Sequence, residues 1–263
     1  MSTMNPYGRN FGAAAADYAR HRAGVPDSLF ERLAQLGVGL PRQCITDIGT
    51  GTGMLGRGFA RRGARVIGVD PDARMLEQAR ELDRAAGVAS EYRVGRAEQL
   101  PLDDDALDVI SAAQCWHWFQ PELAAREMAR ACRASGRVAI VHFDWLPLPG
   151  SLVEATERLI EAHNPKWDLG GGDGFHPESL PYLRAAGFGA FEQFSYEVDV
   201  PYTPEGWRGR IRASAGVGAS LSPETIAAFD EEHARVIAQR FAGETVLAPH
   251  RVFAIVGERL GKI

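Results

Sequence analysis

The sequence predicts an α/β fold in which helices cover both faces of a seven-stranded, mostly parallel sheet. Short β-branched runs alternate with helix-length amphipathic segments through the first half of the chain, which is typical of βαβ units. The clearest unit spans residues 45–71, where one apolar run ends in three alternating glycines and the next ends in an acid. Two further segments in the last third of the chain indicate an antiparallel strand pair at the end of the sheet.

The elements follow in order from local signals. The first strand is nearly all apolar, as expected of a parallel strand that is buried on both faces. Gly63 and Gly87 end the two helices that come next, and Pro71 with Asp72 opens the second of these helices. Strands are expected at residues 44–48, 65–69, 91–94, 106–111, 137–145, 191–200 and 249–258. Helices are expected at residues 26–36, 54–62, 73–86, 121–134, 151–163, 177–186, 205–213 and 223–241.

A single domain with an elaboration is the organisation that 263 residues predict. We expect residues 1–145 to form an N-terminal lid and the ligand-binding core. Residues 146–263 then complete the same domain, with strands at 191–200 and 249–258. The stretch between these strands is longer than a connection needs, so we expect residues 204–245 to form a helical insertion that caps the substrate.

Composition argues against several classes of function. The net charge of -5 and a pI near 5.8 argue against a nucleic-acid-binding surface. No segment has the length and apolarity to span a bilayer, and residues 1–10 lack the apolar core of a secretory signal. Cys44, Cys115 and Cys132 have neither metal-ligand spacing nor a disulfide framework, which fits a reducing cytoplasm. We predict a cytoplasmic monomer or homodimer, and the preference for arginine over lysine hints at a GC-rich bacterial genome.

The loop after the first strand predicts a nucleoside site. Its residues run Asp47-Ile48-Gly49-Thr50-Gly51-Thr52-Gly53. Because glycine has no Cβ, the backbone can take positive φ and a ligand can lie directly against its amides. Asp70, at the tip of the second strand, can accept two hydrogen bonds from the vicinal hydroxyls of a ribose. These residues indicate an adenosine-type ligand.

Two adenosine ligands are compatible with this loop. Gly51, Gly53 and Gly56 satisfy the G-x-G-x-x-G pattern of dinucleotide sites, so an NAD(P)-dependent oxidoreductase is one alternative. Asp47, however, places a carboxylate just before the turn, where it suits an ammonium group better than a pyrophosphate. Gly49 adds a third glycine at the turn itself. These features favour S-adenosylmethionine.

From about Tyr18 to Asp144 the sequence resembles the class I S-adenosylmethionine-dependent methyltransferases, in the branch related to the ubiquinone-biosynthesis and trans-aconitate methyltransferases. The glycine loop and Asp70 are the most specific residues of this resemblance. It implies a Rossmann-like, doubly wound sheet with an antiparallel C-terminal strand pair. It also implies methyl transfer to a small-molecule acceptor, which needs no metal. A non-catalytic relative that only binds the cofactor is a second alternative.

The resemblance also implies which residues hold the cofactor. A segment of the form Tyr-x-x-x-Arg, which folds over the cofactor in the family, corresponds to Tyr18 and Arg22, and Ala23 stands in place of the usual proline. The helix after Asp70 begins at the adenine pocket, which brings in Met75. The implied cofactor residues are Tyr18, Asp47, Gly49, Thr50, Gly51, Gly53, Asp70, Pro71, Met75, Ala97, Glu98 and Gln114.

One position departs from the family pattern. The family has Asp-Ala-Glu where this chain has Arg96-Ala97-Glu98, so the aspartate that would accept the adenine amino group is absent. Either the backbone around Ala97 holds the adenine or Glu98 partly substitutes.

Polar and aromatic side chains follow the fourth and fifth predicted strands, at the edge where open α/β sheets bind ligands. His117 lies between two tryptophans after the fourth strand, and His142 and Asp144 alternate with apolar residues at the end of the fifth. Any of the three could act as a general base on a hydroxyl or amine acceptor. Packing of the tryptophans and surface placement of the polar residues are the alternatives. A carboxylate acceptor would need only cations, and Arg20, Arg22, Arg208, Arg210 and Arg212 are available.

Overall fold

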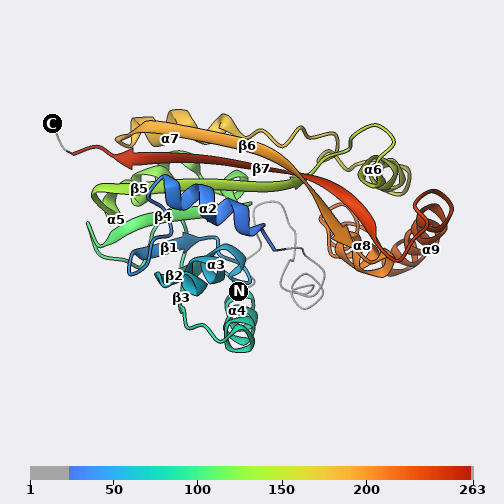
Figure 1. Ribbon diagram of the computed structural model, residues 1–263, viewed down its shortest axis with the longest axis horizontal. Helices are drawn as coiled ribbons and strands as arrows, with labels where there is room; N and C mark the ends of the chain where they lie inside the picture. Colours follow the sequence, from blue (N-terminus) through green and yellow to red (C-terminus); the bar gives the residue numbers. More distant parts are fainter. Residues whose placement is uncertain (1–23, 262–263) are drawn as a thin grey trace. The chain divides into compact units, whose positions relative to one another are not determined.

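The computed structural model describes residues 24–261 and contains the seven-stranded sheet that the sequence predicts (Figure 1). Within these residues the strands lie in the order β3-β2-β1-β4-β5-β7-β6. The strands are β1 (Cys44–Ile48), β2 (Arg65–Asp70), β3 (Glu91–Val94), β4 (Leu107–Ala113), β5 (Cys132–Trp145), β6 (Phe188–Tyr202) and β7 (Val246–Arg259). The helices are α2 (Asp27–Gln35), α3 (Met54–Arg61), α4 (Ala73–Ala86), α5 (Pro121–Ala131), α6 (Leu152–His163), α7 (Leu180–Ala185), α8 (Pro204–Arg212) and α9 (Pro223–Arg240).

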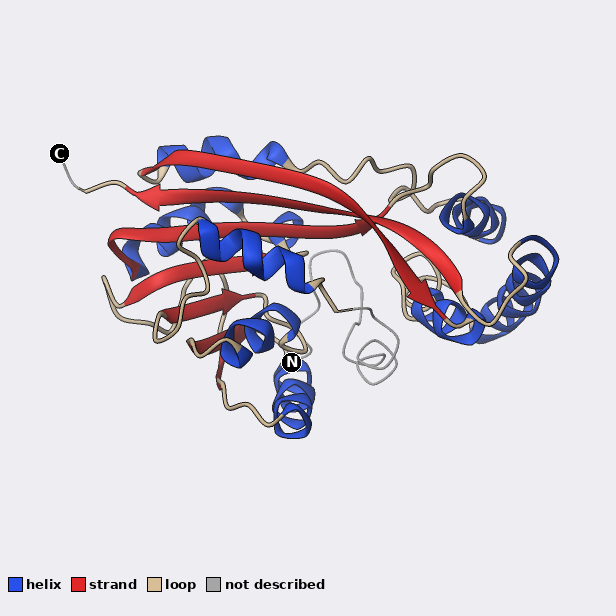
Figure 2. Cartoon of the chain, viewed as in Figure 1, coloured by secondary structure: helices blue, strands red, loops and turns tan. Residues whose placement is uncertain are grey.

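The strand directions confirm the predicted fold class. β1 pairs in parallel with both β2 and β4, β2 pairs in parallel with β3, and β4 pairs in parallel with β5. β7 runs opposite to its neighbours β5 and β6 (Figure 2). From β1 the chain order goes outward in both directions, so the carboxyl ends of β1 and β4 form the point at which such sheets bind ligands.

Right-handed crossovers place the helices on both faces of the sheet. The β1–α3–β2 and β4–α5–β5 connections lead in opposite directions from the centre, so α3 and α5 cover opposite faces. On the α3 face, α2 approaches closely because Gly58 has no side chain, and the Phe30 ring packs edge-on against Phe59 at 5.3 Å. On the other face, Met128 of α5 and Leu183 of α7 share one buried cluster with Ile110 of β4.

The largest difference from the predicted bounds lies between α5 and β5. The helical pattern of residues 121–134 suggested a helix to Ala134, but α5 ends at Ala131 and β5 begins at Cys132. Cys132 is fully buried and pairs with Leu107 of β4, so sheet pairing overrides the alanine-rich helical signal. The backbone of Ser135 then takes a φ of 62°, which turns the strand before it pairs with β4 again at Arg137.

The chain packs as two compact units, each with its own core. The first contains Gly24–Phe143, His176–Ser195 and the chain from Phe253 on, and it holds the parallel part of the sheet. The second contains Asp144–Phe175 and Tyr196–Val252, in which α6, α8 and α9 surround a cluster that includes Trp207 and Phe229. The cap function of residues 204–245 and the division at residue 145 stay predictions. The segment with Tyr18, Arg20 and Arg22 lies outside the described residues.

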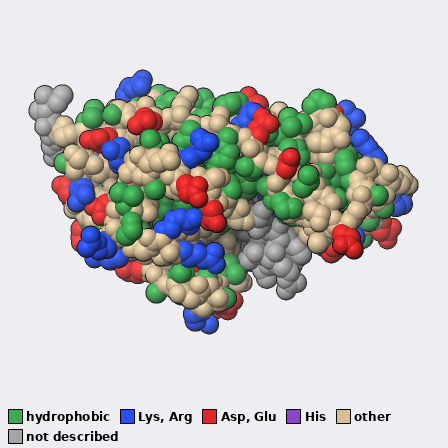
Figure 3. All heavy atoms as spheres, viewed as in Figure 1, with side chains coloured by type: hydrophobic (Ala, Val, Ile, Leu, Met, Phe, Trp, Pro, Cys, Tyr) green, Lys and Arg blue, Asp and Glu red, His purple; other side chains and the backbone are tan. Residues whose placement is uncertain are grey.

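On the face drawn in Figure 3, acidic and basic side chains are interspersed. None of the helices among residues 24–261 combines the length and apolarity that a membrane crossing requires. The predicted location, the oligomeric state and the lack of a nucleic-acid partner stay predictions.

Candidate functional site

In the glycine loop after β1, protein atoms pack closely against Gly49 and Gly53, and Gly51 is the one of the three glycines that leaves room for a ligand. Gly49, Gly51 and Gly53 have φ values of 61°, 55° and 77°. A Cβ on Gly49 would meet the Cys115 Sγ at 2.8 Å, and one on Gly53 would meet the Tyr92 hydroxyl at 2.5 Å. A Cβ on Gly51 would touch only the Met75 Cε, at 3.4 Å. Gly51 is therefore the point at which a ligand can approach the backbone.

Asp47 holds the loop in shape. Its Oδ2 accepts a hydrogen bond from the Thr50 hydroxyl at 2.7 Å, and its Oδ1 accepts one from the Ser111 hydroxyl at 2.8 Å. Burial raises the pKa of Asp47 to about 6, against the hydrogen bonds from Thr50, Ser111 and the Gly56 amide. The side chain is only 1% exposed. In this structure both carboxylate oxygens are therefore bound within the protein, and the predicted role of Asp47 beside a ligand ammonium stays a prediction.

Asp70 joins the loop to the end of β2. Its Oδ2 accepts a hydrogen bond from the Gly51 amide, and its Oδ1 accepts one from the Asp72 amide, each at 2.9 Å. Burial raises the pKa of Asp70, although both amide hydrogen bonds oppose the shift. One amide on each oxygen fixes the carboxylate and leaves a further lone pair on each oxygen for a diol. Pro71, next to it, is exposed.

The residues expected at the adenine differ in their burial and in their hydrogen bonds. Met75 and Ala97 are buried, with exposures of 8% and 5%. Glu98 accepts a hydrogen bond from the Gln120 amide at 2.9 Å and pairs with the exposed Arg96 at 3.4 Å. Because Gln120 is the residue before α5, the Glu98 carboxylate stabilises the start of that helix. This contact joins residues far apart in the chain, and no local pattern signals it.

Gln114, just past β4, has a strained backbone. Its φ is 59°, which an ordinary side chain rarely adopts, at a cost on the order of 1–3 kcal/mol. Two hydrogen bonds hold it there. Its amide donates to the Val141 carbonyl at 3.0 Å, and its side-chain Nε2 donates to the Phe143 carbonyl. The turn after β4 is thereby fixed to β5, next to the glycine loop.

Of the aromatic residues after Gln114, Trp116 packs in the core and His117 lies at the surface. Trp116 is 7% exposed, meets Phe119 edge-on at 6.0 Å and lies 6.4 Å from the Tyr182 ring, so it belongs to the core. His117 is exposed, and its ring lies 4.4 Å from that of Trp118.

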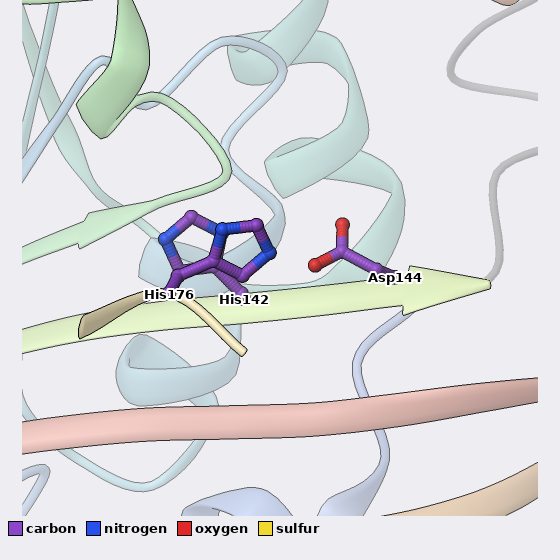
Figure 4. A group of neighbouring side chains, drawn as sticks. All are labelled: His142, Asp144 and His176. Atoms are coloured by element: carbon purple, nitrogen blue, oxygen red, sulfur yellow. The ribbon is translucent and has the colours of Figure 1, made fainter. Parts of the chain in front are cut away.

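His142 stacks on a histidine that the sequence did not single out. The His142 ring is 3% exposed and lies 3.8 Å from the His176 ring, with 14° between their planes. Asp144 follows on the same side of β5 (Figure 4). Nearly parallel imidazoles direct their in-plane lone pairs side by side instead of toward one point, so we assign no ion to this group. His176 comes from the loop before α7, and only the fold brings it to β5.

Comparison with known proteins bears on the same region. Residues 46–140 match the methyltransferase domain family. An uncharacterised methyltransferase of Mycobacterium tuberculosis is 37% identical over 134 residues, which cover 50% of this chain and 51% of the relative. The chain thus spans about half the length of these curated relatives.

Solved structures share the fold along most of the chain. A protein from Anaeromyxobacter dehalogenans, described as a candidate type II methyltransferase, has a TM-score of 0.63 at 24% identity and covers 92% of this chain and 99% of that chain. Haemonchus contortus phosphoethanolamine N-methyltransferase 2, solved with S-adenosylhomocysteine, has a TM-score of 0.56 at 18% identity and covers 95% of this chain and 57% of that chain. The domain match and the shared fold together support the resemblance of this chain to the class I S-adenosylmethionine-dependent methyltransferases.

Proposed function

We propose that the protein transfers the methyl group of S-adenosylmethionine to a small-molecule acceptor by direct in-line displacement. One observation carries the proposal. The Asp70 carboxylate is held by the amides of Gly51 and Asp72 beside the one loop glycine that is open to a ligand. This arrangement suits a ribose whose two hydroxyls donate to Asp70 while the rest of the nucleoside follows the loop.

The residues present fit the cofactor. Asp70 would hold the ribose hydroxyls, the backbone at Gly49 and Gly51 would hold the amino-acid part, and Met75 with Ala97 would line the adenine. When bound, the cofactor supplies a methyl group on a sulfonium, which is already a good leaving group.

The loop favours this cofactor over a dinucleotide. In the G-x-G-x-x-G pattern the second glycine is the one whose backbone approaches the pyrophosphate. That position is Gly53 here, and the Tyr92 hydroxyl fills the space where its side chain would be. The oxidoreductase alternative therefore loses its main support.

The protein's part in catalysis is to hold the acceptor in line with the methyl group and to exclude water. Orientation of this kind can be worth roughly 7–11 kcal/mol of barrier. If the acceptor is a hydroxyl or an amine, we propose His142 as the residue that takes its proton, because the ring is buried and its plane is fixed by His176. Asp144 and the exposed His117 are the other candidates.

Calorimetry with S-adenosylhomocysteine, S-adenosylmethionine and NADH tests the cofactor assignment. We expect micromolar or tighter binding of the first two and none of NADH. Methyl-labelled cofactor incubated with cell extract then tests catalysis, and a labelled small molecule is the expected product. Cofactor binding without any labelled product would favour the non-catalytic alternative.

A further inference from the structure

Helix α8 carries three arginines, and two of them are neutralised inside the second unit. Arg208 donates from Nε to Asp230 Oδ1 at 3.1 Å and pairs with Glu205 at 3.0 Å. Arg212 donates to the same Asp230 oxygen at 2.7 Å and also pairs with Glu205. Both charges are therefore paired within the second unit, and their contacts with Asp230 hold α8 against α9.

Arg210, between them, is different. It makes no hydrogen bond and no ion pair with any residue in the described range 24–261. Its guanidinium carbon lies 5.0 Å from the centre of the Trp145 ring, and the side chain is half-buried. Burial lowers the pKa of Arg210, while the charges of Tyr202 and Asp144 oppose the shift. A guanidinium carries five N–H donors, and here the ring satisfies none of them directly.

The aromatic support under Arg210 is rigid. The Trp145 indole donates to the Glu157 carboxylate at 2.7 Å, and Glu157, 5% exposed, also accepts from the Gly171 amide at 2.8 Å. Trp145 meets Trp207 edge-on at 5.8 Å, and the Trp207 indole is itself bonded to Thr156 at 2.9 Å. A cation on such a platform keeps its orientation without a partner of its own, which lowers the ordering cost of binding.

Trp145 also has a defined place in the chain. It is the last residue of β5, and two residues before it the Phe143 carbonyl accepts the hydrogen bond from Gln114. Arg210 therefore stacks on the last residue at the carboxyl end of β5.

We propose that Arg210, stacked on Trp145, binds the oxyanion of a small organic carboxylate or phosphate. Guanidinium matches both groups through paired hydrogen bonds. The partly buried Trp145 ring beside it suits an aromatic or unsaturated body next to the anion. Arg210 binds this group and takes no part in making or breaking bonds.

Three probes of one shape test the proposal on the full chain. Benzoate and phenyl phosphate carry the two oxyanions, and benzamide is their neutral counterpart. Each is titrated by ligand-observed NMR into the protein and into Arg210→Gln, Arg210→Lys and Arg158→Gln. Arg158 is a matched control because it lies in the same unit with its side chain 68% exposed and paired with Glu154. Thermal melting of every variant establishes that it is folded.

We expect at least one anion to bind the wild-type protein about tenfold or more tightly than benzamide does. Arg210→Gln should abolish that preference, Arg210→Lys should keep part of it, and Arg158→Gln should keep all of it. The stronger of the two anions identifies the oxyanion. Failure of both anions to bind, equal binding of benzamide, or an unchanged preference in folded Arg210→Gln overturns the proposal. A parallel titration with S-adenosylhomocysteine separates this result from the proposed function, since that ligand should bind all four proteins alike.

Discussion

The Asp70 carboxylate accepts a hydrogen bond from the Gly51 amide at 2.9 Å, which ties the end of β2 to the open position of the glycine loop. The acid and the glycine therefore form one surface, although 19 positions separate them in the chain. A ligand that meets one must meet the other, and this relationship makes the site testable by substitution.

Replacement of Asp70 by alanine should weaken S-adenosylhomocysteine binding by about tenfold to a hundredfold, because hydrogen bonds to a charged acceptor are lost. Asp70→Asn keeps one acceptor oxygen and should fall between alanine and the wild type. Isothermal titration calorimetry measures both. Unchanged affinity in a folded Asp70→Ala protein would refute the ribose assignment.

Gly51→Ala should block the ligand while Gly87→Ala should not. Both glycines have positive φ, 55° and 68°, so each substitution costs a similar backbone strain of about 1–2 kcal/mol. A Cβ at Gly87 has nothing within 4 Å, whereas one at Gly51 projects beside Met75 into the proposed ligand space. We expect similar losses of thermal stability in the two variants and lost cofactor affinity only in Gly51→Ala. Equal affinities would place the ligand elsewhere.

The buried Asp47 should make the protein less stable as the pH rises. Its pKa is about 6 in the folded protein, above its ordinary value of 3.8, so between these pH values the folded state binds the proton that the unfolded state releases. The free energy of unfolding should fall by about 2 kcal/mol from pH 4 to pH 6 through this group. Urea titrations across this range should show that the Asp47→Asn variant lacks this pH dependence of the free energy of unfolding.

His233 should act in the opposite direction. The ring is fully buried, its Nε2 lies 3.1 Å from the Thr156 hydroxyl, and burial lowers its pKa to about 4 from 6.5. As the pH falls from 6.5 to about 4, the unfolded state binds a proton that the folded state does not bind. The contribution of about 3 kcal/mol is therefore lost on acidification.

The two groups act in opposite directions in the wild type, so each single variant should show the pH dependence that the other group contributes. Asp47→Asn should lose stability steeply below pH 6, and His233→Gln should gain stability over the same range. Parallel pH profiles of the two variants would contradict both assignments.

Local signals were enough for much of the fold. β1, β3 and α4 have the predicted bounds, because glycine, proline and aspartate mark their ends within a few residues. The glycine loop and Asp70 were also visible, since the backbone conformation and the strand end are both local properties. The error at Cys132 arose where pairing with β4 decided the outcome.

The residues that surround the loop could not be assigned from the sequence. The Asp47 carboxylate is occupied by Ser111, 64 positions away, and Glu98 is occupied by the start of α5. His176 reaches His142 from a separate loop, and the free state of Arg210 depends on its neighbours pairing with Asp230. Each of these facts is a contact between distant segments, which residue pattern alone does not encode.

The place of β7 has a consequence for synthesis. Within residues 24–261 this strand is the last element in chain order, yet it lies between β5 and β6 in the sheet. Until it emerges from the ribosome, β5 has an unpaired edge and β6 has no neighbour to bind. The nascent chain therefore exposes apolar strand edges until β7 has been made. We expect it to depend on chaperones during translation more than a protein whose strands are added to the sheet in order at one edge.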